Sequence, residues 1–396
     1  MVSAKLRVIR NQENFFRQNF NKQPMKHYKI AILAGDGIGP EITKEAIKIL
    51  KLVEQRNAVT FELLPALFGA CAYFETGDAF PRETIEICDQ ADAILKGTIG
   101  LSHEESKKIP VDKQPERGAL LPLRRRYNTY ANFRPVSLPR QLAHFSPLKP
   151  EIIGDGIDLV IVRELVGGLY FGAKETGVND QGLRYVKETL EYDEGQIRRI
   201  LHQAFRLANR RKKVLHNIHK SNVLKSSVLW NEILEEVAPE YPDVEVVHLL
   251  VDAAATLLCL KPTQFDVMVM ENMFGDILSD QGGGILGSLG LMPSACLGDE
   301  KAYYEPSHGS APDIAGKNIA NPYSMIGSVA MMLENSFGMD REAKNIWDAM
   351  QGVFGDGYST ADLSKSGSGV TMLSTDEFGD KVAAKLSEMP SAAGTA

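Results

Sequence analysis

Two aspartates spaced four residues apart are the most informative chemical feature of the sequence. Asp276 and Asp280 lie in ENMFGDILSD, and on a helix both carboxylates project from one face. A solvated acidic face is one interpretation, but the flanking residues are apolar or glycine, which favours a bound cation. Mg²⁺ or Mn²⁺ prefers such oxygen ligands. Asp252, in the hydrophobic run HLLVDAAATLL, would be costly to bury alone, so three aspartates predict one metal site.

Several arginines could bind an acidic substrate beside that metal. Arg163 directly follows the apolar segment LVIV, at the carboxyl end of a predicted strand, where α/β proteins bind ligands. Arg124 belongs to a run of three arginines, and Arg134 lies in YANFRP. Guanidinium groups near a metal suit a substrate with two carboxylates. Tyr170 and Lys220 are candidate proton-transfer groups, although their spacing alone does not assign that role.

A segment rich in small residues, 305–321 (EPSHGSAPDIAGKNIAN), could surround an adenosine. Asp313 would accept hydrogen bonds from a ribose 2′-hydroxyl and repel a 2′-phosphate, which favours NAD over NADP. His308 could also be an ordinary surface histidine. The turn GDGIGP does not complete a dinucleotide fingerprint, because Pro40 stands where glycine or alanine is required. We therefore interpret it as a tight turn between a strand and a helix.

The elements that must position these residues alternate between strand and helix. Tyr28–Leu33 predicts a buried strand, and Glu41–Gln55 predicts a helix with apolar residues on one face. Further short apolar segments continue the alternation, at Ile85–Cys88, Ala91–Leu95, Leu159–Arg163, Val214–Ile218 and Val267–Met270. Amphipathic helices are predicted at Glu194–Asn209 and Val228–Val237. The pattern predicts an α/β fold with a largely parallel sheet.

Composition narrows the class of protein. The 396 residues are enough for more than one domain, and the net charge of −7 argues against nucleic acid or an anionic membrane as the main partner. Four well-separated cysteines predict reduced thiols in a cytoplasmic compartment. The longest apolar stretch, 246–260, is interrupted by His248 and Asp252 and is shorter than the roughly 20 residues that span a bilayer.

Residues 1–24 differ from the rest of the chain, with five basic residues and one acid. They contain no apolar region, which excludes a secretory signal. An organelle-targeting segment should be rich in serine, and only Ser3 is present. A misassigned start upstream of Met25 explains the segment at least as well, so we predict a cytoplasmic location.

Several long motifs resemble those of the β-decarboxylating dehydrogenases in order and spacing. They are GDGIGPE, LRRRYNTYANFRP, VRELVGGLYFG, HKSNVL, NMFGDILSD and EPSHGSAPDIAGKNIANP. The resemblance runs from about Lys26 to about Met389 and is strongest to the isopropylmalate branch. It implies a non-Rossmann fold with one domain from residues 25–129 and 287–389 and another from 130–286, between an extension (1–24) and a tail (390–396). It also implies a homodimer in which two subunits complete each active site.

The resemblance also implies residue roles. Arg124, Arg134 and Arg163 would bind the substrate carboxylates. Asp276 and Asp280 would bind the metal, with Asp252 of the partner subunit contacting metal and substrate. Lys220 of the partner subunit would be the base for the substrate hydroxyl, and Tyr170 would protonate the enol left after CO₂ loss. NAD would contact Glu116 at the nicotinamide end and, in the adenosine-binding loop, His308, Gly309, Ser310, Ala311, Asp313 and Asn321.

The implied reaction is NAD-dependent oxidative decarboxylation of 3-isopropylmalate to 4-methyl-2-oxopentanoate, a step of leucine biosynthesis. Leu120 and Leu121, just before Arg124, suit an isopropyl group. His219 and the stretches 98–103 and 253–256 depart from the isopropylmalate pattern. They keep open the same chemistry on homoisocitrate, isocitrate, D-malate or tartrate. A silent regulatory subunit would lack one of the chemical residues, and all are present.

Overall fold

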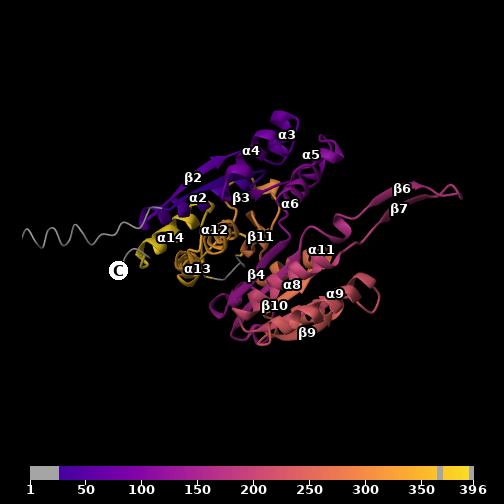
Figure 1. The fold of residues 1–396 in the computed structure, drawn as a ribbon. Coiled ribbons are helices and arrows are strands. Elements are labelled where there is room, and N and C mark those ends of the chain that lie inside the picture. The colour runs from indigo at the N-terminus through magenta and orange to yellow at the C-terminus, as the bar shows by residue number, and fades with distance from the viewer. Residues whose placement is uncertain (1–25, 364–368, 392–396) are drawn as a thin grey trace, which may run out of the picture.

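The computed structural model describes residues 26–363 and 369–391 (Figure 1). The expected extension at 1–24 and residues 392–396 of the expected tail lie outside the described residues. None of the described helices is long and apolar enough to cross a membrane.

One large mixed sheet organises the molecule. Its strand order is β2-β1-β3-β12-β11-β4-β5-β10-β8-β9. The strands are β1 (Lys26–Gly35), β2 (Val59–Pro65), β3 (Ala93–Thr98), β4 (Ala131–Pro139), β5 (Gly156–Glu164), β8 (Val214–His219), β9 (Glu245–Leu250), β10 (Val267–Met270), β11 (Pro293–Leu297) and β12 (Ala302–Pro306). β11 pairs antiparallel with β12 and β4, and β4 with β5, whereas the other pairs are parallel. The predicted α/β fold with a largely parallel sheet is confirmed.

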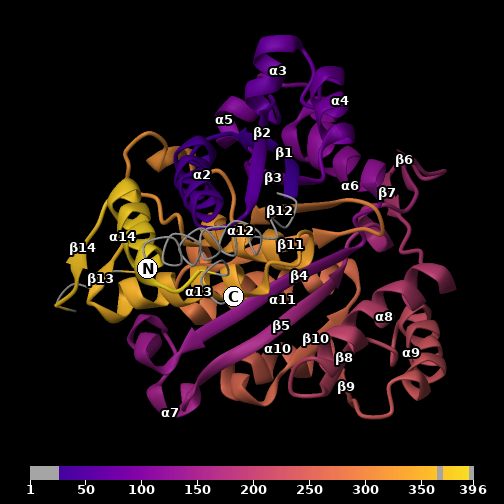
Figure 2. The same cartoon turned by 60° about the vertical axis from the view of Figure 1, so that its left-hand side comes forward.

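Helices cover both faces of this sheet (Figures 1 and 2). They are α2 (Gly39–Arg56), α3 (Ala70–Thr76), α4 (Arg82–Gln90), α5 (His103–Ser106), α6 (Leu121–Tyr127), α7 (Pro150–Ile153), α8 (Glu194–Asn209), α9 (Lys225–Val237), α10 (Val251–Leu260), α11 (Asn272–Leu286), α12 (Tyr323–Asn335), α13 (Asp340–Gly355) and α14 (Thr375–Glu388). The predicted helix at Glu194–Asn209 matches α8, and α9 begins three residues before the predicted Val228. α2 forms because Ile42, Ala46, Ile49 and Val53 share one face, which is fully buried.

One predicted segment has a different structure. Ile85–Cys88 lies inside α4, not in a strand. The buried residues of α4 are Thr84 and Cys88, which are four apart and therefore share a helix face. An apolar run of four residues is too short for its periodicity to separate strand from helix.

Two small two-stranded sheets lie outside the main sheet. β6 (Lys174–Val178) and β7 (Arg184–Glu188) form an antiparallel hairpin that projects from the body of the molecule (Figure 1). Val178, Leu183 and Val186 on it are each more than 60% exposed. β13 (Tyr358–Ser359) pairs with β14 (Thr371–Met372). The hairpin therefore exposes several apolar side chains among charged ones, and such exposed apolar surface is typical of a contact site.

Alternation along β4 gives the sheet two functionally different faces at its centre. Arg134 lies on the face next to α11, where it lines one cavity. Its neighbours Phe133 and Pro135 line a separate cavity on the opposite face. Successive strand residues point to opposite sides, so the two cavities are separated by the thickness of one sheet.

Candidate active site

A cavity of about 420 Å³ lies on the α6 and α11 side of the sheet, and we call it the catalytic cavity. It brings together many of the residues predicted for substrate, metal and cofactor. Those that line it are Glu116, Leu120, Leu121, Arg124, Arg134, Arg163, Tyr170, Asp276, His308 and Gly309. The sequence predicted this convergence of residues that lie far apart in the chain.

Three buried arginines form the cationic wall of this cavity. Arg124 on α6 and Arg134 on β4 are 5% exposed, and Arg163 at the end of β5 is 1% exposed. Each is fixed by a neutral partner: Arg124 Nε donates to Tyr303 Oη at 2.9 Å, and Arg134 Nε to Asn132 Oδ1 at 2.8 Å. Burial and the neighbouring charge of Arg134 lower the pKa of Arg163 to about 10. The wall therefore gains stability when an anion enters.

Asn272 anchors Arg163 and shows how α11 is attached to the site. Its Oδ1 accepts from both Arg163 Nε, at 3.0 Å, and Arg163 Nη2, at 2.7 Å. The Arg163 stem passes directly over Gly275, where a Cβ would lie 2.4 Å from Arg163 Cγ. The glycine of NMFGD is therefore required for α11 to approach the arginine closely.

Asp276 is the link between the arginine wall and Tyr170. Its carboxylate accepts from Arg163 Nη1 at 2.5 Å and from Tyr170 Oη at 2.8 Å. Burial alone would raise the pKa of Asp276, but Arg163 and the Tyr170 hydrogen bond outweigh it and lower that pKa. Burial and the bond to Asp276 raise the pKa of Tyr170 to about 12. At neutral pH the pair is an anionic carboxylate beside a protonated phenol.

Asp276 and Asp280 both lie on α11, and their oxygens fit a hard divalent ion. Asp280 Oδ1 lies 3.3 Å from Arg134 Nη1, and burial raises the pKa of Asp280. The described part of the chain brings no three His, Cys, Asp or Glu side chains together in a form that could hold a metal. Two aspartates can hold a hard cation such as Mg²⁺ when water molecules complete its coordination.

The predicted base and third metal ligand lie away from the catalytic cavity. Lys220 follows β8, Asp252 lies at the start of α10, and their side chains form an ion pair. That hydrogen bond lowers the pKa of Asp252. Within one subunit they are therefore partners of each other and do not reach the arginine wall.

The predicted adenosine loop begins at the edge of the cavity. Ser307 lines the cavity, and its Oγ is buried without a hydrogen-bond partner among the described residues. The open backbone at Gly309 and this free hydroxyl fit a bound polar ligand. His308 Nε2 lies 2.8 Å from Ser324 Oγ, and burial lowers its pKa, so His308 is a neutral, fixed side chain. Asp313 is exposed further along the loop.

Four predicted residues of this loop do not line the catalytic cavity: the exposed Asp313, and Ser310, Ala311 and Asn321. Ser310 is buried, and its carbonyl accepts from Ile38 N–H at 2.8 Å. Ala311 has a left-handed φ of 41°. Asn321 accepts from Tyr323 N–H at 3.0 Å. These hydrogen bonds and this backbone conformation stabilise the loop outside the cavity.

The GDGIGP turn supports the loop and contacts the cavity indirectly. A Cβ on Gly37 would lie 2.1 Å from the Ser310 carbonyl oxygen, so only glycine allows this approach. The Asp36 carboxylate accepts backbone N–H groups of Ala70, Cys71 and Gly100, at 2.8–3.0 Å. The interpretation of this turn as a structural junction fits these contacts.

The sequence reasoning missed a buried ion pair in the cavity. Lys96, at 2% exposure, lies 2.6 Å from Glu305 Oε2. Burial raises the pKa of Glu305, but Lys96 and Arg124 outweigh it, so this pKa is lowered. A signal was present, because Lys96 follows the apolar run Ala93–Leu95 as Arg163 follows LVIV. The pair adds a fourth buried cation to the substrate region.

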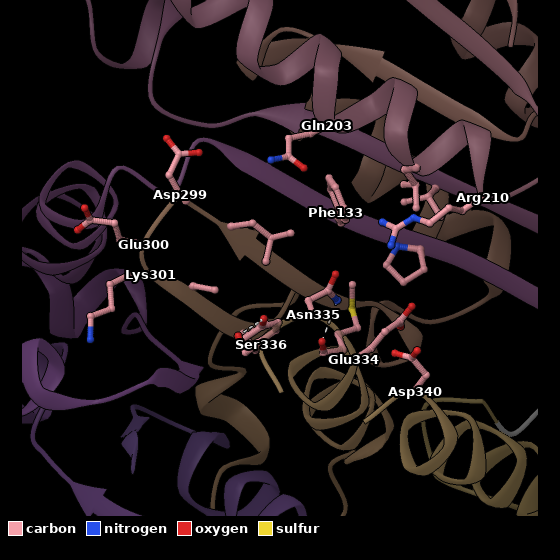
Figure 3. A pocket seen from close by; sticks show the side chains of 18 of the residues that line it. Phe133, Gln203, Arg210, Asp299, Glu300, Lys301, Glu334, Asn335, Ser336 and Asp340 are labelled. Carbon is pink, nitrogen blue, oxygen red and sulfur yellow. Dashed lines mark hydrogen bonds between the residues drawn. The ribbon is translucent and has the colours of Figure 1, made fainter. Parts of the chain in front are cut away.

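A second hollow, which we call the back cavity, lies on the opposite face of the sheet. It measures about 900 Å³, and Phe133, Pro135 and Val160 form its apolar floor. Figure 3 shows Arg210 from α8 directed into it, with Glu334 and Asp340 on the other side. These three charged side chains are exposed, so water solvates them.

An α/β fold with arginines, carboxylates and a protonated tyrosine at strand ends defines an enzyme that acts on a small acid with more than one carboxylate. Residues 29–382 match the model of the isocitrate/isopropylmalate dehydrogenase family. The chain belongs to this family, and it is a decarboxylating dehydrogenase.

Individual relatives agree. The 3-isopropylmalate dehydrogenase of Thermotoga maritima is 48% identical over 361 residues, covering 91% of this chain and 99% of that protein. The Aquifex aeolicus 3-isopropylmalate dehydrogenase is 45% identical over 368 residues, or 93% of this chain and 100% of that one. The crystal structure of isocitrate dehydrogenase from Methylococcus capsulatus has a TM-score of 0.79 at 33% identity, covering 91% of this chain and 100% of that chain.

Proposed function

We propose that this enzyme catalyses the oxidative decarboxylation of 3-isopropylmalate to 4-methyl-2-oxopentanoate in leucine biosynthesis, using NAD and Mg²⁺ or Mn²⁺. The assignment of the substrate rests on the position of Leu120 and Leu121. Both line the catalytic cavity beside Arg124, so an apolar group on the substrate meets leucine where its carboxylates meet arginine. Burying an isopropyl group there is worth about 2 kcal/mol.

Different residues of this chain bind the substrate and transfer its proton. Arg124, Arg134 and Arg163 hold and orient its carboxylates. Tyr170 keeps its proton at neutral pH and lies at the cavity wall, so it can donate that proton to the enol that remains after CO₂ leaves. Asp276 accepts a hydrogen bond from the Tyr170 hydroxyl and so fixes the position of the Tyr170 side chain.

Asp276 and Asp280 would hold the divalent ion, which supplies Lewis-acid stabilisation of negative charge on the substrate oxygens. Glu116 and the loop from His308 to Asn321 would hold NAD, which supplies the hydride acceptor. The buried free hydroxyl of Ser307 supports a polar ligand at this edge of the cavity. Asp313, exposed in the loop, favours NAD over NADP because a 2′-phosphate would be repelled.

We also propose that the enzyme acts as a homodimer with shared sites. Among the described residues that line the catalytic cavity, none is assigned as the base or as a third metal ligand. Lys220 and Asp252 lie outside it as an ion pair, which would have to separate for them to serve a neighbour's cavity. Ile277 on α11 and Leu260 on α10 are 60% and 57% exposed, which suits burial by a second copy. The two-domain division at 25–129 with 287–389 and 130–286, and the cytoplasmic location, remain predictions.

A second candidate substrate class is a tricarboxylate such as homoisocitrate or isocitrate. The observation that favours it is the additional positive charge in the cavity. Lys96, Arg117 and Lys174 line it together with the three arginines. Lys96 is paired with Glu305 and so partly neutralised, which leaves Arg117 and Lys174 as the cations available for a third carboxylate.

The test is NAD reduction by the purified enzyme with Mg²⁺ or Mn²⁺ on 3-isopropylmalate, homoisocitrate, isocitrate and D-malate, with NADP as the alternative acceptor. We expect 3-isopropylmalate to be preferred at least tenfold in kcat/KM. Leu120→Ser should then reduce that preference by about tenfold. Preference for homoisocitrate or isocitrate would show that Arg117 and Lys174 decide the substrate. Full activity after chelation of divalent ions would contradict the metal assignment.

A further inference from the structure

A small hollow lies beside the turn that begins at Lys220, after β8, and we call this turn the Lys220 turn. Several polar atoms that line the hollow have no hydrogen-bond partner among the described residues. Tyr192, Ile218, His219, Ser226, Ser227, Trp230 and Glu271 line it, and it leaves about 10 Å³ in which the centre of a water molecule can lie. Trp230 is 3% exposed and Glu271 is 6% exposed. Trp230 Nε1 and both carboxylate oxygens of Glu271 are buried without a hydrogen-bond partner among the described residues. Leaving such groups unpaired in the protein interior is destabilising.

Trp230 and Glu271 do not form a hydrogen bond with each other in this structure. Trp230 supplies one N–H donor, and Glu271, when ionised, supplies only acceptors. Ser227 Oγ already accepts the Lys220 N–H at 3.0 Å, which leaves its own hydroxyl proton to be placed. The Trp230 N–H, the Ser227 hydroxyl proton and the Glu271 carboxylate are therefore left to be paired around a space of about one water molecule, which Tyr192, His219 and Ser226 also line.

We propose that one ordered water molecule occupies this hollow and connects Glu271 to the Lys220 turn. The water would accept hydrogen bonds from Trp230 Nε1–H and from the Ser227 hydroxyl, and would donate its two protons to the Glu271 carboxylate. This arrangement satisfies each unpaired atom and gives the water four partners, within the usual range for buried water.

The connection matters because of what lies on each side of it. Ser227 is in the first turn of α9 and holds the backbone of Lys220, the candidate base. Glu271 directly precedes Asn272, which anchors Arg163, and is the residue before α11, which carries Asp276 and Asp280. The water would therefore tie the element that carries the base to the element that carries the substrate and metal residues. Glu271, Trp230 and Ser227 are positioning residues in this scheme.

The role of Lys220 as base rests on the proposed function, but the water itself does not. A crystal structure of the full chain tests the water directly. We expect density for one water within about 3.2 Å of Trp230 Nε1, Ser227 Oγ and a Glu271 oxygen. An empty hollow, or Glu271 bonded directly to Trp230 or Ser227, would overturn the proposal.

Kinetics test the positioning role. Trp230→Phe keeps an aromatic ring and removes the N–H, and Trp347→Phe on α13 is the matched control. We expect Trp230→Phe to lower kcat about 5–20-fold with KM unchanged within twofold and with a larger solvent isotope effect on kcat, because the proton step slows. Partial unfolding would lower kcat but leave that isotope effect unchanged, and this result would overturn the positioning role.

A double-mutant cycle links the residues. If Trp230 and Glu271 act through one water, the fold-loss of kcat in the double variant should be much smaller than the product of the fold-losses in Trp230→Phe and Glu271→Gln. Additive losses would contradict a shared water. If the wild-type enzyme turns over none of the tested acids, the proposed function fails, and the same cycle measured on the free energy of unfolding still decides whether the water couples the two residues.

Discussion

The catalytic cavity and the back cavity lie against the same strands but differ in how their charges are held. In the smaller catalytic cavity, Arg124, Arg134 and Arg163 are at most 5% exposed. Each is fixed by hydrogen bonds to Tyr303, Asn132 or Asn272. In the back cavity, more than twice as large, Arg210, Glu334 and Asp340 are exposed to water.

This difference shows that volume alone does not define the functional site. A buried charge with fixed partners cannot be solvated by rearrangement, so it retains a strong field directed into the cavity. An exposed charge is screened by water and salt and can change rotamer. Neutral partners anchor all three arginines of the catalytic cavity. In the back cavity, hydrogen bonds hold Arg211 and Asp299, whereas Arg210, Glu334 and Asp340 are exposed.

The largest effect is expected for Arg163→Leu. It removes a guanidinium that is 1% exposed, leaves Asn272 Oδ1 without the donors of Arg163 and leaves Asp276 with Tyr170 alone. We expect kcat/KM to fall about 10³-fold, equivalent to about 4 kcal/mol. Steady-state kinetics on the preferred substrate measure this, and circular dichroism verifies that the variant is folded. A loss below tenfold would mean that Arg163 does not contact the substrate.

Tyr170→Phe should have the next largest effect. It removes a proton donor but keeps the ring that packs beside Arg163. We expect kcat to fall about 10²–10³-fold while KM changes less than threefold, because the hydroxyl acts in proton transfer and not in holding the carboxylates. Tyr185→Phe on the exposed hairpin is the matched control. Equal losses in both variants would remove the proton-donor role from Tyr170.

Glu271 gives a pH-dependent prediction for stability. Burial raises its pKa from 4.5 to about 7. As pH rises between these values, the carboxyl ionises in the unfolded chain but stays protonated in the folded one, so the wild type loses stability and gains none back above pH 7. Relative to wild type, Glu271→Gln should gain on the order of 2–3 kcal/mol in unfolding free energy between pH 4.5 and 8. Urea unfolding across that range measures it, and a constant difference would show that the pKa is not raised.

The sequence carried enough information to predict residues whose role depends on local position. Asp276 and Asp280 were placed on one helix by their spacing, and Arg163 at a strand end by the apolar run before it. These features follow from periods of 3.6 and 2, which are local properties of the chain. Arg163 was named in advance by this rule, but Lys96, which follows the apolar run Ala93–Leu95 in the same way, was not.

Residues whose role depends on strand pairing could not be predicted in the same way. Lys96 meets Glu305 because β3 pairs with β12, with Ile94 opposite Tyr303 and Leu95 opposite Tyr304. Nothing in either segment specifies that neighbour. The contacts of Ser227, Trp230 and Glu271 likewise depend on how α9 packs beside the start of α11. Long-range register and packing decide these contacts, and a single sequence does not show them.

The smallest effect is expected in the back cavity, and it tests the comparison most directly. Arg210→Leu removes the charge that α8 directs into that hollow (Figure 3). Because Arg210 is exposed and water already solvates it, we expect kcat/KM to change less than twofold and the free energy of unfolding by less than about 0.5 kcal/mol. The same substitution at Arg163 is the comparison, since Arg163 is buried, anchored by Asn272 and lines the catalytic cavity, whereas Arg210 is exposed and lines the back cavity. A tenfold loss of activity in Arg210→Leu would show that the back cavity is coupled through the sheet to catalysis, and burial would then be an insufficient guide to which charges matter.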